Sequence, residues 1–137
     1  MMRQPELDTS ATAELRVTDA DLASALHLEP GDEFPAVFAT SRMIALMEVA
    51  ASRLLRPFLE EGELSVGVTV DVVHTAATPK GGMVTATATY TAQEGKLFVF
   101  EVSAADDAGE VGRGTHKRAV VATSRLLTGA AKRAPRR

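Results

Sequence analysis

Hydrophobic and polar residues alternate along much of the second half of the chain, with the period of two that is typical of β-strands. In residues 63–75 one predicted face carries Leu64, Val66, Val68, Val70 and Val72, and the other carries Ser65, Gly67, Thr69 and Asp71. The alternation continues through residues 84–92 and 97–105, and a last strand reaches about Thr123. Turn residues separate these segments, which predicts hairpins in series, and residues 11–17 predict one further strand.

A period of 3.6 residues begins after Thr40 and predicts a long helix. Its apolar stripe consists of Met43, Leu46, Met47, Ala50 and Leu54, widened by Ile44, Ala51 and Leu55. Pro57 ends the pattern. A helix that is apolar over so wide an arc should be wrapped by other structure.

One wrapped helix followed by consecutive antiparallel strands predicts an α+β fold, the hotdog fold, in which a curved antiparallel sheet encloses one long central helix. We expect a single domain over residues 11–125, a disordered segment at residues 1–10 and a basic, flexible tail at residues 126–137. Residues 18–32 predict a lid-like segment. Because so small a sheet leaves an edge strand exposed, a homodimer that pairs these edges is expected, and a tetramer stays open.

Composition narrows the chemistry. The 137 residues contain no Cys, which removes disulfides, thiolate nucleophiles and Cys-rich zinc sites, and we expect no metal site. Residues 1–131 hold 11 basic and 18 acidic side chains, and an acidic body argues against nucleic acid as a partner. The chain has no signal-like N-terminus and no apolar run long enough for a membrane span, so we expect a soluble cytoplasmic protein.

Glu48 is the most informative polar residue of the predicted helix. It lies on the shoulder of the apolar arc beside Ile44 and Ala51, where a carboxylate is partly removed from water. Two interpretations follow from the periodicity. The carboxylate is either a functional acid in a cleft, or a helix-edge Glu that reaches water or pairs with Arg53 or Arg56.

His74 and Thr40 are candidates on neighbouring elements. His74 continues the even, apolar register of its strand and should point toward the helix, although a lone inward His is more often structural. Thr40 immediately precedes the helix and is first of all a candidate N-cap. A helix N-terminus also offers free N–H groups and a positive dipole end, which suit a thioester carbonyl or an oxyanion.

Glycines and basic residues on the strands have two interpretations each. Gly67 interrupts a Val-rich strand, which indicates either a bend or a close approach of the backbone to another group. Gly112 and Gly114 are interpreted in the same way. His116 and Arg118 share one face of the last strand, and a solvated face is the default for them, with ligand contact as the alternative.

Three blocks of sequence carry a resemblance to a known family. The segments FPAVFATSRMIALMEVA, VGVTVDVVHTAATPKG and GRGTHKRAVV resemble, in order and spacing, the characteristic blocks of the fluoroacetyl-CoA thioesterase family of hotdog proteins. The resemblance spans residues 34–121. Three separated blocks in register are a far stronger signal than any single one.

The resemblance implies roles for six residues. The family's catalytic Thr, Glu and His match Thr40, Glu48 and His74. Its substrate-contacting residues match Phe34, Gly67 and Arg118. Where a second lid aromatic is expected in the fluoroacetate-specific enzyme, this chain has Gly31, and one aromatic fewer weakens the exclusion of water and of other small acyl groups. The resemblance therefore leaves the acyl group and the fluoroacetyl selectivity open.

The implied reaction is hydrolysis of a short-chain acyl-CoA to the free acid and CoA, with no cofactor beyond the CoA of the substrate. Thr40 and the helix N-terminus would orient the thioester carbonyl, Glu48 would act as nucleophile or as general base, and His74 would support proton transfer to the leaving thiolate. One alternative is a non-catalytic acyl-CoA-binding hotdog protein. An acyl-thioester hydratase or dehydratase is another, but the chain lacks the HxFPxxP-like block of the dehydratases.

Overall fold

The computed structural model describes residues 4–135. Its strands are β1 (Ser10–Arg16), β2 (Glu63–His74), β3 (Met83–Glu94), β4 (Leu97–Asp106) and β5 (Gly109–Ala122). Its helices are α1 (Thr40–Leu55) and α2 (Thr123–Lys132), with the short 3₁₀ turns η1 (Asp19–Asp21), η2 (Ala23–Leu26) and η3 (Arg56–Phe58). The helix and the five strands expected from periodicity are all present, and their ends differ from the predicted ones by one or two residues.

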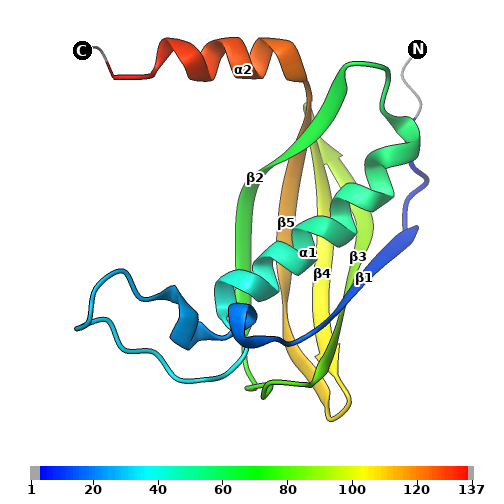
Figure 1. Ribbon diagram of the computed structural model, residues 1–137. Helices are drawn as coiled ribbons and strands as arrows, with labels where there is room; N and C mark the ends of the chain where they lie inside the picture. The colour runs from blue at the N-terminus through cyan, green and yellow to red at the C-terminus, as the bar shows by residue number, and fades with distance from the viewer. Residues whose placement is uncertain (1–3, 136–137) are drawn as a thin grey trace.

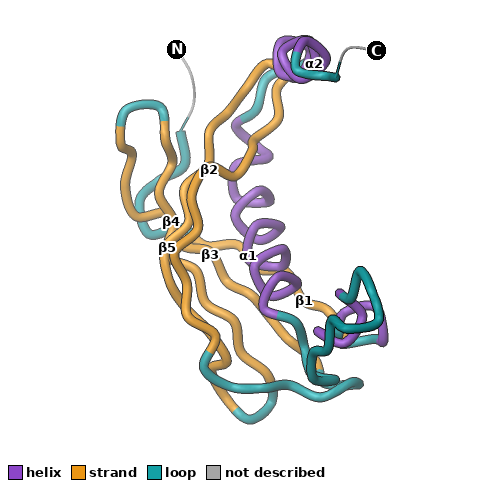
Figure 2. Tube along the Cα trace, turned by 90° about the vertical axis from the view of Figure 1, so that its left-hand side faces the viewer, coloured by secondary structure: helices purple, strands orange, loops and turns teal. Residues whose placement is uncertain are grey.

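The strands form one antiparallel sheet in the order β1-β3-β4-β5-β2, which leaves β1 and β2 at its edges. The sheet curves along the length of α1, which lies against its concave side (Figures 1 and 2). This arrangement confirms the predicted hotdog fold. None of the helices within residues 4–135 is long and apolar enough to cross a membrane.

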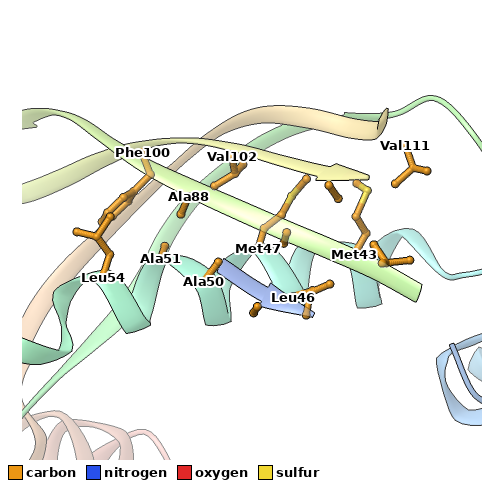
Figure 3. Packing of buried hydrophobic residues seen from close by; sticks show 14 of the residues in the cluster. Met43, Leu46, Met47, Ala50, Ala51, Leu54, Ala88, Phe100, Val102 and Val111 are labelled. Carbon is orange, nitrogen blue, oxygen red and sulfur yellow. The ribbon is translucent and has the colours of Figure 1, made fainter. Parts of the chain in front are cut away.

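The core lies between α1 and the middle strands (Figure 3). The helix buries the stripe that its periodicity predicts, with Met43 and Met47 almost fully enclosed against strand residues such as Phe100 and Val111. Burying side chains of this size contributes about 1.5–3 kcal/mol each. The core therefore fixes which face of α1 meets the sheet, and with it the direction in which Glu48 points.

The strand β2 departs from its predicted register. A bulge lies between Gly67 and Thr69, so that two residues of β2 face one of β5 and the side-chain alternation changes sides there. Gly67 faces Glu48 of α1 before the bulge, whereas His74 faces Thr40 of α1 after it. The prediction of one continuous apolar face from Leu64 to Val72 is therefore wrong, and several apolar residues of β2 are exposed: Leu64, Val68, Val70 and Val73.

Both ends of the described chain contain contacts or regular structure that the sequence did not predict. At the N-terminal end, Pro5 is buried, and the N–H of Asp8 donates to the carbonyl oxygen of Tyr90 at 2.7 Å. At the C-terminal end, residues 123–132 form the helix α2, which no sequence pattern predicted, and the flexibility of residues 126–135 stays a prediction. The predicted disorder of residues 1–3 and flexibility of residues 136–137 lie outside the described residues.

Candidate active site

Thr40 and His74 form the first part of the site. Thr40 is the first residue of α1, and its Oγ1 shares a hydrogen bond of 2.8 Å with Nδ1 of His74 at the end of β2. Ala39 takes the N-cap position, and no side chain caps the helix there. The predicted capping role of Thr40 is therefore wrong, because its hydroxyl faces the strand. His74 points toward the helix, as its register predicts.

A cavity of about 440 Å³ opens at the pair formed by Thr40 and His74. Its wall includes Phe34, Pro35 and Val37 from the segment before α1. The ring of Phe38 meets the ring of His74 edge-on, with centroids 6.4 Å apart. Phe38 is buried, and no pattern in the sequence singles it out.

Three polar groups at or next to this cavity lack partners. Nε2 of His74 is buried and has no hydrogen-bond partner among the described residues. The backbone N–H groups of Thr40 and Ser41, at the start of α1, have no acceptor within residues 4–135 either. Buried polar groups are seldom left unpaired in proteins, so an unpaired imidazole nitrogen beside a helix N-terminus indicates a place for a further polar group.

Glu48 forms the second part of the site. Its Oε2 lies 3.1 Å from a terminal guanidinium nitrogen of Arg118 on β5. A Cβ on Gly67 would lie only 2.6 Å from the same oxygen, so the absent side chain of Gly67 makes room for the carboxylate. The Glu48 side chain is 40% exposed and can still reach water. Arg118 is the partner of Glu48, in place of the expected Arg53 or Arg56.

Arg118 is held from three sides. Its Nε donates to Oγ of Ser65 at 3.0 Å, and a terminal nitrogen donates to the Ser65 carbonyl oxygen at 2.9 Å. The other terminal nitrogen donates to Glu48 and also lies 3.1 Å from Nε2 of His116. Arg118 and His116 are buried, which overturns the expected solvated face. Ser65 had no distinguishing signal in the sequence, since it is one small polar residue on an alternating strand.

The hydrogen bonds of His116 fix the form of its ring. A guanidinium can only donate, so Nε2 of His116 must accept, and the ring hydrogen must sit on Nδ1. Nδ1 then donates to the Thr69 carbonyl oxygen at 2.8 Å. Burial and the positive charge of Arg118 lower the pKa of His116, against the opposing effects of the Thr69 carbonyl and of Glu48. A neutral His116 therefore helps to aim Arg118 at Glu48.

Within one chain the three predicted catalytic residues fall into two clusters. Eight residues separate Thr40 from Glu48 on the same helix, which places their backbones about 12 Å apart at 1.5 Å per residue. The first cluster joins Thr40 to His74, and the second joins Glu48 to Gly67 and Arg118. A carboxylate that attacks a carbonyl, or that activates a water for the attack, must lie within about 3 Å of its target. One chain alone does not bring the two clusters together.

The described residues contain no group of three or more His, Cys, Asp or Glu side chains that could hold a metal ion. The groups that the site does offer are a hydroxyl, an imidazole, a carboxylate, a guanidinium and backbone N–H groups. These groups can orient a carbonyl, attack it or activate water, and transfer a proton.

Comparisons with known proteins agree with the geometry. Residues 17–124 match the family model described as fluoroacetyl-CoA-specific thioesterase. A fluoroacetyl-CoA thioesterase of Streptantibioticus cattleyicolor is 50% identical over 99 residues, which cover 69% of this chain and 71% of that protein. The solved structure of the fluoroacetyl-CoA thioesterase FlK superimposes with a TM-score of 0.91 at 38% identity, covering 97% of this chain and all of that one.

A hypothetical protein of Thermus thermophilus from the thioesterase superfamily is more distant. It is 26% identical, with a TM-score of 0.85 over 96% of this chain and 94% of that one. The family model covers most of the described residues, including both clusters of the site. The chain belongs to the fluoroacetyl-CoA-specific thioesterase family of hotdog proteins.

Proposed function

We propose that this protein hydrolyses a short-chain acyl-CoA thioester at a site that two copies of the chain build together. The observation that carries this proposal is the division of the site into two clusters, each incomplete by itself. The relative from Streptantibioticus cattleyicolor and FlK are fluoroacetyl-CoA thioesterases, and a variant of FlK has been solved in complex with acetyl-CoA. These relatives support a small acyl group on CoA as the substrate class.

The exposed edge of β2 supports a homodimer. All twelve residues of β2 lie at the rim of the sheet, and Val68, Val70 and Val73 are exposed there. An unpaired strand with apolar side chains is a template for a second strand, and a second copy of β2 fits it through a two-fold axis. Antiparallel pairing about the middle of β2 carries the Glu48 cluster of one copy toward the Thr40 and His74 cluster of the other.

The proposed reaction uses both clusters. The free N–H groups at the start of α1 and the hydroxyl of Thr40 bind the thioester carbonyl oxygen and stabilise the charge that develops on it. Glu48 of the partner subunit attacks the carbonyl carbon or removes a proton from an attacking water. The carbon–sulfur bond then breaks, and His74 supplies a proton to the leaving thiolate of CoA. Where Glu48 itself attacks, an anhydride between Glu48 and the acyl group forms, and water then hydrolyses it to the free acid and restores the carboxylate. These steps use side chains, backbone, the substrate and one water.

The size of the acyl group follows from the wall of the cavity. Phe34 is half-exposed at its mouth, and Gly31 lies in open space, where an added Cβ would meet nothing within 4 Å. A single aromatic ring at the mouth excludes water less completely than two would. We therefore propose that acetyl-CoA and fluoroacetyl-CoA are both substrates, with weaker discrimination than in an enzyme that has a second aromatic there.

Release of thiol from a panel of acyl-CoA substrates tests the reaction. Glu48→Gln and His74→Ala should each lower kcat by about 100-fold or more, since each removes a group used in proton transfer or attack. A protein that merely binds acyl-CoA would saturate without releasing thiol. Unchanged turnover in either variant would contradict the assignment of that residue.

Mixing the two inactive variants tests the shared site. A mixed dimer of Glu48→Gln and His74→Ala chains has one site with both groups intact and one with neither. After unfolding and refolding together, such a mixture should regain about a quarter of the wild-type activity, because half of the dimers are mixed and each has one good site of two. A mixture as inactive as its components would place both groups in the same chain.

A further inference from the structure

The helix α2 projects away from the body of its own chain. It follows β5 at one end of the sheet and extends beyond the edge strand β2 (Figure 1). None of its ten residues is buried. Its apolar side chains Leu126 and Leu127 are 44% and 62% exposed, and Leu126 and Ala130 share one side of the helix at i, i+4 spacing.

A helix of this length needs a partner. Isolated helices shorter than about 12 residues are marginal in water, and Gly129 in the second half of α2 lowers its helix propensity by about 1 kcal/mol. The contacts of α2 within its own chain bury none of its residues. Packing against another surface is therefore what would stabilise it.

A second segment projects beyond β2 at the opposite end of the strand. We call residues 22–38, between η1 and α1, the lid segment (Figure 1). Backbone hydrogen bonds from Ala23 to Val37 and from Ser24 to Pro35, 2.7 and 3.1 Å long, hold its base. Its tip exposes apolar side chains, with Leu28 95% exposed. The lid segment and α2 therefore each present apolar groups to solvent.

The charges of the two segments are opposite. The tip of the lid segment has the sequence LEPGDEF, with three acidic residues and no basic one. The helix α2 and the residue after it carry Arg125, Lys132 and Arg133 and no acid. Within residues 4–135, none of the ion pairs involves these basic residues or the acids Glu29 and Glu33. Each segment thus has unpaired charge that suits the other.

Within one chain the two segments cannot meet. They flank opposite ends of β2, whose twelve residues span about 40 Å at 3.3 Å per residue. Both lie on the same side of the sheet as α1 (Figure 2). A two-fold axis that passes through the middle of β2, perpendicular to the sheet, exchanges the two ends of the strand. It leaves α2 and the lid segment of the second copy on the same side of the sheet as those of the first. It therefore carries α2 of one copy to the lid segment of the other.

We propose that α2 docks in trans on the lid segment of the partner subunit, with Leu126 and Leu127 against the apolar tip and the basic residues against Glu29 and Glu33. This inference rests on the homodimer proposed above. Phe34 of the lid segment lines the cavity beside Thr40 and His74. In this way α2 of each copy stabilises the segment that lines its partner's acyl site. The helix carries no catalytic group itself but contributes to substrate binding.

Cross-linking tests the contact directly, because the natural chain has no Cys and any thiol is an introduced one. The double variant Leu28→Cys/Leu127→Cys, treated with a short bis-maleimide, should form covalent dimers on a denaturing gel. The matched control is Leu7→Cys/Leu127→Cys, which places the first thiol at another exposed leucine, before β1 at the other edge of the sheet. The single variants Leu28→Cys and Leu127→Cys measure the background of cross-links between the same position in two copies.

The outcome separates this inference from the dimer on which it rests. If sedimentation shows a wild-type dimer and the Leu28/Leu127 variant cross-links no more than the control, the docking of α2 is refuted while the dimer stands. A wild-type monomer would refute both. Charge reversal adds a functional readout: Arg125→Glu/Lys132→Glu should raise KM about threefold or more with kcat little changed, and Glu29→Lys/Glu33→Lys in the same chain should restore it.

Discussion

Replacing Gly67 by alanine should remove most of the activity while leaving the fold intact. The new Cβ would lie 2.6 Å from Oε2 and 3.3 Å from Cδ of Glu48, and 3.2 Å from Cε1 of His116. Ordinary van der Waals contact requires about 3.5 Å, so the carboxylate must retreat by roughly 1 Å. It can do so, because it is the far end of a flexible side chain.

The loss of activity should be much larger than the loss of stability. The retreat breaks the 3.1 Å contact between Glu48 and Arg118, and a misplacement of about 1 Å at a reacting group costs on the order of 100-fold in rate, or about 2.7 kcal/mol. The contact itself contributes at most about 1 kcal/mol to folding, because the Glu48 side chain is 40% exposed. Alanine also leaves the unfolded chain with less conformational freedom than glycine does, which offsets about 0.4–1 kcal/mol of this loss of stability.

Thiol release and thermal unfolding should therefore be measured on the same preparation. The matched control is Gly129→Ala, where a Cβ meets nothing within 4 Å and the helix gains a better helix former. A Gly67→Ala enzyme with kcat within about threefold of wild type would refute the argument that Gly67 makes room for the carboxylate. A large fall in the unfolding temperature would show instead that the glycine serves the fold.

Two further predictions concern β5. Gly114→Ala should lower the free energy of unfolding by about 3 kcal/mol or more in a denaturant titration, because its Cβ would meet the carbonyl oxygen of Asp71 and the backbone of Val72, which cannot move aside; a wild-type midpoint would contradict this. Burial and Arg118 lower the pKa of His116, so as the pH drops this histidine takes up a proton in the unfolded chain before it does so in the folded one. The free energy of unfolding should therefore fall as the pH drops below the ordinary histidine value of 6.5. His116→Gln should reduce this dependence of stability on pH.

The elements of the fold could be predicted because they rest on periodicity. The apolar arc of α1 and the alternation in β3 and β4 each extend over so many residues that a single residue breaking the pattern does not hide the element. The helix α2 was missed for the opposite reason. Its ten residues include Gly129 and two basic side chains, and no buried face marks it, so its sequence is compatible with a solvated tail.

The environment of the site was less predictable than its residues. The bulge at Val68 shifts the register of β2 against β5 by one residue. The hydrophobic periodicity of a sequence does not show where such an extra residue enters a strand. This shift turns Ser65 and Gly67 toward α1, and with them the pocket that takes Arg118 and Glu48. His116 and Arg118 lie on the same face of β5 as Gly112, which packs against Met43 of α1. The alternation in β5 is regular there, but polar side chains on a strand are usually solvated, so nothing in the sequence indicates that this face is the inward one.

The spacing of Thr40 and Glu48 carries information that their chemistry does not. The two backbones lie about 12 Å apart on one helix. Within one chain Thr40 contacts His74, whereas Glu48 contacts Gly67 and Arg118. The proposed dimer answers this separation, because β2 lies at an edge of the sheet where a second copy can pair and bring its own Glu48 toward Thr40.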